Sequence, residues 1–161
     1  MKDLFHKPLK LKGNANDFLF WGCLHYHHDR EFLWKPRGFT NVTDHDTAII
    51  LNWNLKANDN TTGIILGDSM FGKGGKETFL NLFSQLKFQT IYVCGGNHTA
   101  GFKQAFDSVE GNTLYLPGSD RKIIFCPNYF EAFVNGQAIV ISHYAIHSWN
   151  GQGKGSWMLH S

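Results

Sequence analysis

The stretch Gly63-Ile64-Ile65-Leu66-Gly67-Asp68 reads as a short buried strand that ends in a glycine and an acidic residue. A continuous apolar run of this length, bounded by turn residues, is typical of a strand inside a parallel sheet. A Gly-rich loop follows as far as Gly75, and from Lys76 to Leu86 apolar side chains recur at the spacing of an amphipathic helix. The segment therefore predicts a strand, a polar loop and a helix.

The same order of elements is expected on both sides of this stretch. Residues 17–22 read as a buried strand, and Thr43 and Asp44 offer helix-start chemistry for a helix over 46–55. A third strand is expected over 90–94. Strands that alternate with helices predict an α/β fold, with a mostly parallel sheet and helices on its faces.

The second half of the chain is rich in expected strands. Candidates lie at 122–126, 129–134 and 137–142, and Asn135-Gly136 between the last two is a strong signal for a two-residue type I′ hairpin. No repeat, linker or low-complexity tract is visible. We therefore expect a single domain over residues 1–161.

The bulk composition narrows the class of protein. A chain of 161 residues with 42% hydrophobic and 15% aromatic residues can bury a substantial core. A net charge of only +2 gives no indication of nucleic acid as a partner, although it does not exclude one. Three cysteines, an odd number, favour reduced thiols. With no signal peptide and no membrane span visible, we expect a cytoplasmic protein that does not bind membranes.

Side chains with metal-binding or acid–base chemistry follow the expected strands at the point where each strand ends. In open α/β sheets, ligands bind beyond the carboxyl ends of the strands, so these side chains are expected to converge. A shared carboxylate is the natural bridge between two metal ions about 3.5–4 Å apart. The candidate residues are Cys23, His25, Asp68, Asn97, His98 and His143.

Each of these residues also has a plain structural interpretation when taken alone. Asp68 could cap its loop, Asn97 could belong to an ordinary Gly-Gly-Asn turn, and His143 could be a structural histidine at a strand end. The loop after the first strand is harder to explain in this way, because it holds three histidines within four positions and histidine is costly to bury without a partner. This crowding favours a functional site.

Residues 67–74 offer an alternative, because they read G-x-x-x-x-G-K-G between a strand and a helix. That pattern is one residue short of a P-loop. However, Gly74 stands where the loop needs a Ser or Thr for Mg²⁺, and Asp68 would place a negative charge in the phosphate cradle. The P-loop hypothesis therefore ranks below the metal site.

Taken in order, these motifs resemble the calcineurin-like metallophosphoesterases, and among them the small phage- and bacteria-associated branch. The resemblance covers nearly the whole chain from Phe18 onward, and the joint occurrence of the pieces is specific although no single piece is. The matching pieces are Cys23-Leu24-His25-Tyr26-His27-His28 against Asp-Thr-His-Phe-Gly-His, Leu66 to Gly72 against Leu-Gly-Asp-x-x-Phe-Gly, Gly96-Asn97-His98 in full, Ser142-His143-Tyr144, and Gly155 to His160 in the closing segment.

The resemblance implies a β-sandwich flanked by helices, and a hydrolase that cleaves a phosphodiester or phosphomonoester through a metal-activated water. The expected cofactors are two divalent ions of Mn, Fe or Zn, and the expected substrate is a phosphorylated small molecule or nucleotide. By resemblance, His25 binds the first metal, Asp68 bridges both, Asn97 and His143 bind the second, and His98 is catalytic. Cys23, which replaces the family's carboxylate, is a further candidate metal ligand.

Two departures from the family pattern leave a second hypothesis open. Cys23 stands where the family has Asp, and a thiolate is a softer ligand that favours Zn²⁺ or Fe. The closing Gly-His-x-His motif is absent after His160, so the expected fold is C-terminally shortened and one metal site is expected to be weak or empty. The alternative is a catalytically impaired binding or scaffold protein. Missing strands would expose a sheet edge, which predicts a homo-oligomer or reduced stability.

Overall fold

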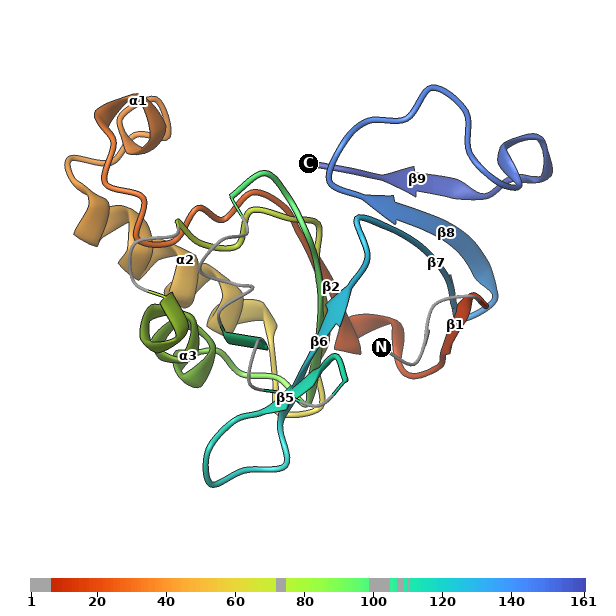
Figure 1. Ribbon diagram of the computed structural model, residues 1–161, viewed down its shortest axis with the longest axis horizontal. Coiled ribbons are helices and arrows are strands. Elements are labelled where there is room, and N and C mark those ends of the chain that lie inside the picture. The colour runs from red at the N-terminus through yellow and green to blue at the C-terminus, as the bar shows by residue number, and fades with distance from the viewer. Residues whose placement is uncertain (1–6, 72–74, 99–104, 107–108, 110) are drawn as a thin grey trace.

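A computed structural model describes residues 7–71, 75–98, 105–106, 109 and 111–161. The chain forms two mixed β-sheets together with helices, which confirms the predicted α/β class (Figure 1). Helices α2 and α3 lie on one side of the larger sheet, and the smaller sheet lies on the other (Figure 1). The larger sheet is therefore covered on both faces, which explains why its strands read as continuous apolar runs.

The larger sheet has five strands in the order β2-β3-β4-β6-β5. The pairs β2–β3, β3–β4 and β4–β6 are parallel, and β5 runs antiparallel to β6. The carboxyl ends of the parallel strands thus lie along one edge, as the sequence predicted. Their bounds are β2 (Phe18–Trp21), β3 (Thr62–Ile65), β4 (Thr90–Cys94), β5 (Thr113–Tyr115) and β6 (Lys122–Cys126).

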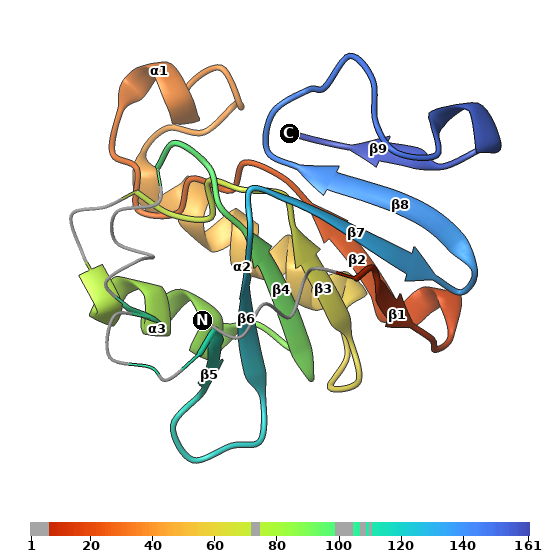
Figure 2. The ribbon, with the colours of Figure 1, turned by 45° about the vertical axis from the view of Figure 1, so that its right-hand side comes forward.

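The smaller sheet has four strands in the order β1-β7-β8-β9. Strands β7 and β8 form the predicted hairpin, and the φ angles of Asn135 and Gly136 are 50° and 90°, as a type I′ turn requires. Figure 2 shows β8 and β9 side by side, with the chain end near the loops after β2 and β3. The bounds are β1 (Leu9–Leu11), β7 (Tyr129–Val134), β8 (Gln137–Ser142) and β9 (Trp157–Leu159).

Two of the three helices correspond to helices that the sequence predicted, whereas the short helix at Glu31–Trp34 was not predicted. The helix expected over 46–55 is longer and starts at residue 42, because the Asn41 side chain accepts a hydrogen bond from the main-chain N–H of Asp44 and so caps the first turn. The helices are α1 (Glu31–Trp34), α2 (Val42–Lys56) and α3 (Gly75–Gln85), with 3-10 turns η1 (Ala15–Asp17) and η2 (Gln152–Lys154).

Two apolar clusters hold these layers together. Ile65 of β3 packs toward the helices with Trp53 and Phe79, whereas its neighbour Ile64 packs toward the smaller sheet with Phe130. All five are at most 2% exposed, and full burial of such a side chain contributes about 1.5–3 kcal/mol. The strand–helix alternation predicted helices on the faces of the sheet, whereas one face packs against helices and the other against the β-strands of the smaller sheet.

Candidate metal centre

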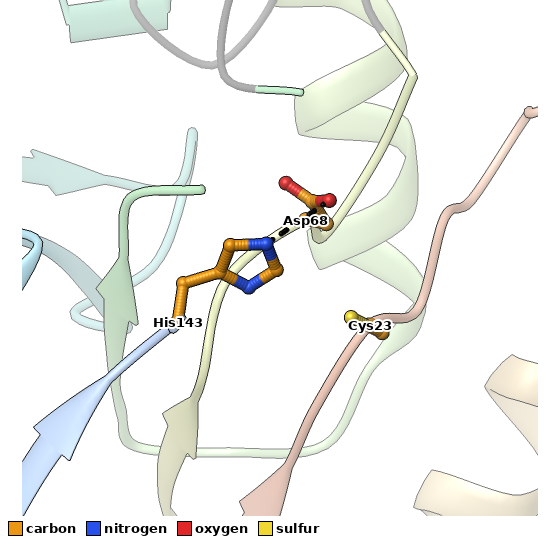
Figure 3. Close-up of side chains that lie close together, drawn as sticks. All are labelled: Cys23, Asp68 and His143. Carbon is orange, nitrogen blue, oxygen red and sulfur yellow. Dashed lines mark ion pairs between the residues drawn. The ribbon is translucent and has the colours of Figure 1, made fainter. Parts of the chain in front are cut away.

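The candidate residues lie along the edge where the parallel strands end. Cys23 follows β2 and Asp68 follows β3, both from the larger sheet, whereas His143 follows β8 of the smaller sheet. Figure 3 shows these three side chains turned toward one another from three separate segments, with the ion pair between Asp68 and His143 dashed. The site is thus built where the two sheets meet.

Asp68 lies at the centre of the cluster and is only 2% exposed. Its Oδ1 accepts a hydrogen bond of 2.9 Å from the main-chain N–H of His98. Its Oδ2 lies 3.7 Å from Nε2 of His25 and 3.4 Å from Nε2 of His143. One buried carboxylate is therefore fixed through one oxygen and faces two imidazole nitrogens with the other.

Two groups of side chains could each hold a metal ion, and they share this carboxylate. In one group, the ligand atoms of Cys23, Asp68 and His143 all lie within 4.8 Å of one another. In the other, those of His25, Asp68 and His98 do. A common carboxylate between two ligand groups is the arrangement that a bridged two-metal site needs.

The spacing of the donor atoms fits a bound cation better than direct hydrogen bonds. Separations of 3.4 and 3.7 Å between Asp68 Oδ2 and the two Nε2 atoms exceed the usual hydrogen-bond range. Metal–ligand bonds of about 2.0–2.2 Å in tetrahedral geometry leave two ligands of one ion roughly 3.4 Å apart. The observed separations therefore leave room for an ion against the carboxylate.

The orientation of His143 gives a second indication of a cation. Its Nδ1 lies 3.2 Å from the carbonyl oxygen of Leu66, which can accept a hydrogen bond from this nitrogen. Its Nε2 faces Asp68 Oδ2 and, at 3.0 Å, Asn97 Oδ1. With the proton on Nδ1, Nε2 and the two oxygens together form a set of electron-rich atoms that could bind a cation, so the residues fit a metal.

Two glycines allow the strands to approach this closely. A Cβ on Gly67 would lie 2.5–2.9 Å from the His143 side chain, and one on Gly96 would lie 2.2 Å from Oδ1 of Asp68. Gly67 also has a φ of 116°, which side chains rarely adopt. The glycines before Asp68 and Asn97 are therefore needed for contact between the elements, which goes beyond a turn preference.

The loop after β2 holds its ligand residues in a strained conformation. Cys23, His25 and His27 have φ angles of 47°, 53° and 60°. In the neighbouring segment after β3, Asp68 has a φ angle of 40°. Such angles cost about 1–3 kcal/mol each and persist only where the surroundings impose them. Here the His25 N–H donates to the Asp68 carbonyl at 2.8 Å, which ties the two ligand segments together.

Residues that sequence reasoning did not select hold this loop from outside. The Arg37 guanidinium donates to the carbonyl oxygens of Cys23 and Leu24, and the Asp46 carboxylate accepts from the His27 N–H. Ser161 lies 3.4 Å from the Cys23 sulfur. Nothing in the sequence signals the roles of Asp46 and Ser161, which depend on the folded chain.

Burial favours the neutral form of His25 and of its neighbour His28. Desolvation lowers the pKa of His25 to about 4, even though the charge of Asp68 opposes the shift. Burial also lowers the pKa of His28, and the charges of His98 and Arg30 add to that effect. A neutral imidazole is the form that binds a metal, so at neutral pH His25 needs to lose no proton to act as a ligand.

The structure brings the predicted site residues together. Cys23 and His143 fall in one ligand group with Asp68, and His25 and His98 fall in the other. Asn97 is largely exposed and adjoins the cluster through His143. His98 is half-buried, and its ring lies edge-on to His25. Part of the predicted Gly-rich loop, residues 72–74, lies outside the described residues.

No protein-family model and no curated protein matches this chain. Among solved structures, the chain is similar to the protein of unknown function AQ665 from Aquifex aeolicus, with a TM-score of 0.54 and 19% sequence identity. The match covers 84% of this chain and 64% of AQ665, so this chain spans a little under two thirds of that protein's length. At this identity the likeness concerns the fold alone. Within the described residues, no helix has both the length and the apolarity to cross a bilayer.

Proposed function

We propose that this protein is a metal-dependent phosphoesterase of the calcineurin-like metallophosphoesterase type. The observation that carries the proposal is Asp68, a buried carboxylate shared by two groups of potential ligands at the ends of parallel strands. The layered arrangement of two sheets and flanking helices also agrees with the sandwich that such enzymes have. Mn²⁺, Fe or Zn²⁺ suits a donor set of imidazole, carboxylate and thiol.

In this proposal some residues of the chain bind the metals and another acts on the phosphate. His25, Asp68 and His143 hold the metals, with Cys23 as a further ligand. When bound, divalent metals polarise a phosphoryl oxygen and activate water for attack. His98 is half-buried beside Asp68, and its ring would donate a hydrogen bond or a proton to the phosphate as negative charge develops.

The test is hydrolysis of a bis-aryl phosphate with added Mn²⁺ or Zn²⁺, measured beside metal content. We expect turnover in the wild-type protein and a loss of about 10²-fold or more in His98→Ala, the usual contribution of a general acid. Metal content distinguishes a proton donor from a metal ligand at His98. Replacement of a proton donor leaves the bound metal in place, whereas replacement of a ligand lowers the metal content. Absence of turnover with every divalent metal would contradict the proposal.

A non-catalytic binding or scaffold protein of the same fold is the second candidate. The observation that favours it is Cys23, which stands at a position where the family has Asp and lies against the hydroxyl of Ser161. That hypothesis predicts metal binding without turnover. The variant Cys23→Asp distinguishes the two, because a scaffold protein gains no activity from it, whereas an enzyme with an altered ligand keeps or increases its Mn²⁺-dependent turnover.

A further inference from the structure

His28 lies directly behind His25 on the side away from Asp68. The Nδ1 atoms of the two rings are 3.2 Å apart, and His28 is only 4% exposed. The His28 ring is clamped by Phe71, against which it stacks with a centroid distance of 3.9 Å and an interplanar angle of 8°. Neither of the two ligand groups contains His28, so its role lies outside the metal centre itself.

The contact between the two Nδ1 atoms decides which nitrogen of His25 carries a proton. Two neutral rings share one proton in such a contact, so one Nδ1 donates and the other accepts. If His25 donates, its Nε2 keeps a lone pair facing Asp68 and can bind a metal. If His28 donates, the proton of His25 must lie on Nε2, and that nitrogen then has no lone pair with which to bind a metal.

The buried histidine of the other ligand group, His143, has a main-chain neighbour at its Nδ1. That nitrogen lies 3.2 Å from the Leu66 carbonyl, which has no proton to give, and this neighbour favours the tautomer that leaves Nε2 for a ligand role. His25 has a second imidazole in place of that carbonyl. Its readiness to bind a metal therefore depends on the proton position of its neighbour.

We propose that His28 is a positioning residue, which accepts the Nδ1 proton of His25 and so holds Nε2 of His25 ready for a metal. The inference rests on the proposed metal site and extends it to a residue outside the ligand set. Stacking on Phe71 fixes the plane of the His28 ring, and this keeps its Nδ1 aimed at His25. Partners of this kind typically change metal affinity by about 10–100-fold when they are removed.

Two variants separate hydrogen bonding from packing. His28→Phe retains an aromatic ring against Phe71 but offers no acceptor, whereas His28→Asn offers an acceptor oxygen close to the position of Nδ1 but no ring. His147→Phe, at an exposed histidine outside both ligand groups, serves as the matched control. Thermal melts in EDTA confirm that each variant is folded before metal is added.

The measurement is Zn²⁺ affinity by competition with a chromogenic chelator, with NMR of the imidazole N–H protons in the Zn²⁺-loaded protein. We expect His28→Phe to weaken binding about 10–100-fold, His28→Asn to recover most of that loss, and the control to match the wild type. The wild-type spectrum should show a protected Nδ1 proton on His25, which is lost or exchanges rapidly in His28→Phe.

Three outcomes would overturn the inference. Equal losses in both variants would mean that His28 acts through packing, and unchanged affinity in His28→Phe would mean that it does not act on the site. In both cases the wild-type protein still binds Zn²⁺, so the metal site stands. A wild-type protein that binds no Zn²⁺ overturns the metal site and this inference together.

Discussion

Asp68 shows how one residue joins the main features of the site. Its Oδ1 is held by the His98 N–H, and its Oδ2 faces imidazole nitrogens from two different segments. Its φ of 40° is uncommon for a residue other than glycine, and the neighbouring segments impose it. A buried carboxylate in this position is costly unless it is paired, and a shared cation would satisfy it fully.

Gly96→Ala tests the close approach to this carboxylate. The added Cβ would lie 2.2 Å from Asp68 Oδ1 and 2.9 Å from its main-chain nitrogen, so Asp68 must move. We expect a loss of about 1–3 kcal/mol in the free energy of unfolding and weaker Zn²⁺ binding. Gly153→Ala is the control, since no atom lies within 4 Å of its added Cβ. Equal stability of the two variants by urea denaturation would contradict this packing argument.

The role of Cys23 can be read from the reactivity of the thiols. Cys94 and Cys126 are 1% and 0% exposed, and burial raises the pKa of Cys94 to about 12, whereas Cys23 is half-buried. We expect one thiol to react with a disulfide reagent in the folded protein and none in Cys23→Ser. If Cys23 is a ligand, Zn²⁺ slows this reaction and Mg²⁺, which prefers oxygen ligands, does not. A rate that Zn²⁺ leaves unchanged would exclude Cys23 from the ligand set.

At the scale of elements, the loop after β2 depends on neighbours from the helical layer. Asp46 of α2 accepts hydrogen bonds from the His27 N–H, and Arg37 precedes the same helix and holds the carbonyl of Cys23. Main-chain contacts from His25 and Tyr26 to the segment after β3 complete the support. The strained loop is thus held on both sides, which keeps its ligand residues in place before any metal binds.

Asp46→Ala tests this support. The Asp46 side chain is 13% exposed, and its removal leaves the His27 N–H without its acceptor, which costs about 1–3 kcal/mol. The same change should weaken Zn²⁺ binding, because the loop carries Cys23 and His25. Asp59→Ala, at an exposed position in the turn after α2, should change stability by less than about 0.5 kcal/mol. If Asp46→Ala weakens the fold but leaves Zn²⁺ affinity unchanged, the loop is held by other contacts.

The sequence predicted the long elements better than the short ones. Strands 122–126, 129–134 and 137–142 have the predicted bounds, because each is an apolar run closed by turn residues. Strand β1 has three residues with a lysine at its centre, and it forms by pairing with β7 more than 100 residues later. No local pattern encodes such a pairing. The same holds for β9, which pairs in parallel with β8.

The site could be predicted only in part for a related reason. Asp68 and His143 were recognisable because each follows an apolar strand, and parallel strands end at one edge. The contact between them depends on how the two sheets pack, which the sequence does not state. Only the resemblance, with its β-sandwich, predicted that strands cover one sheet face, because a strand buried on both faces reads alike under a helix or a second sheet.

At the scale of the whole molecule, the site links the two sheets. Asp68 belongs to the larger sheet and His143 to the smaller one, and Ile64 and Phe130 pack between the sheets below them. A metal bound at this site would therefore couple to the packing of the two sheets. An ion that binds only the folded chain stabilises it, by about 2.7 kcal/mol at a metal concentration of 100 Kd.

The metal-free molecule should also be sensitive to acid. Burial lowers the pKa of His25 from 6.5 to about 4, so between these values the unfolded chain binds a proton that the folded chain does not. Stability is therefore complete above about pH 6.5 and falls as the pH drops toward 4. Urea midpoints in EDTA across this range should decline more steeply for the wild type than for His25→Gln. Parallel pH profiles for the two proteins would contradict the assignment of this acid sensitivity to His25.

The central claim is that the strand-end cluster is a metal centre built around Asp68. Calorimetric titration of the metal-free protein with Zn²⁺ tests it most directly, with Asp68→Asn as the matched variant of nearly equal shape. We predict saturable binding to the wild type and loss of binding in Asp68→Asn, because both ligand groups share this carboxylate. A wild-type protein that binds no Zn²⁺, or a variant that binds it equally well, would contradict the claim.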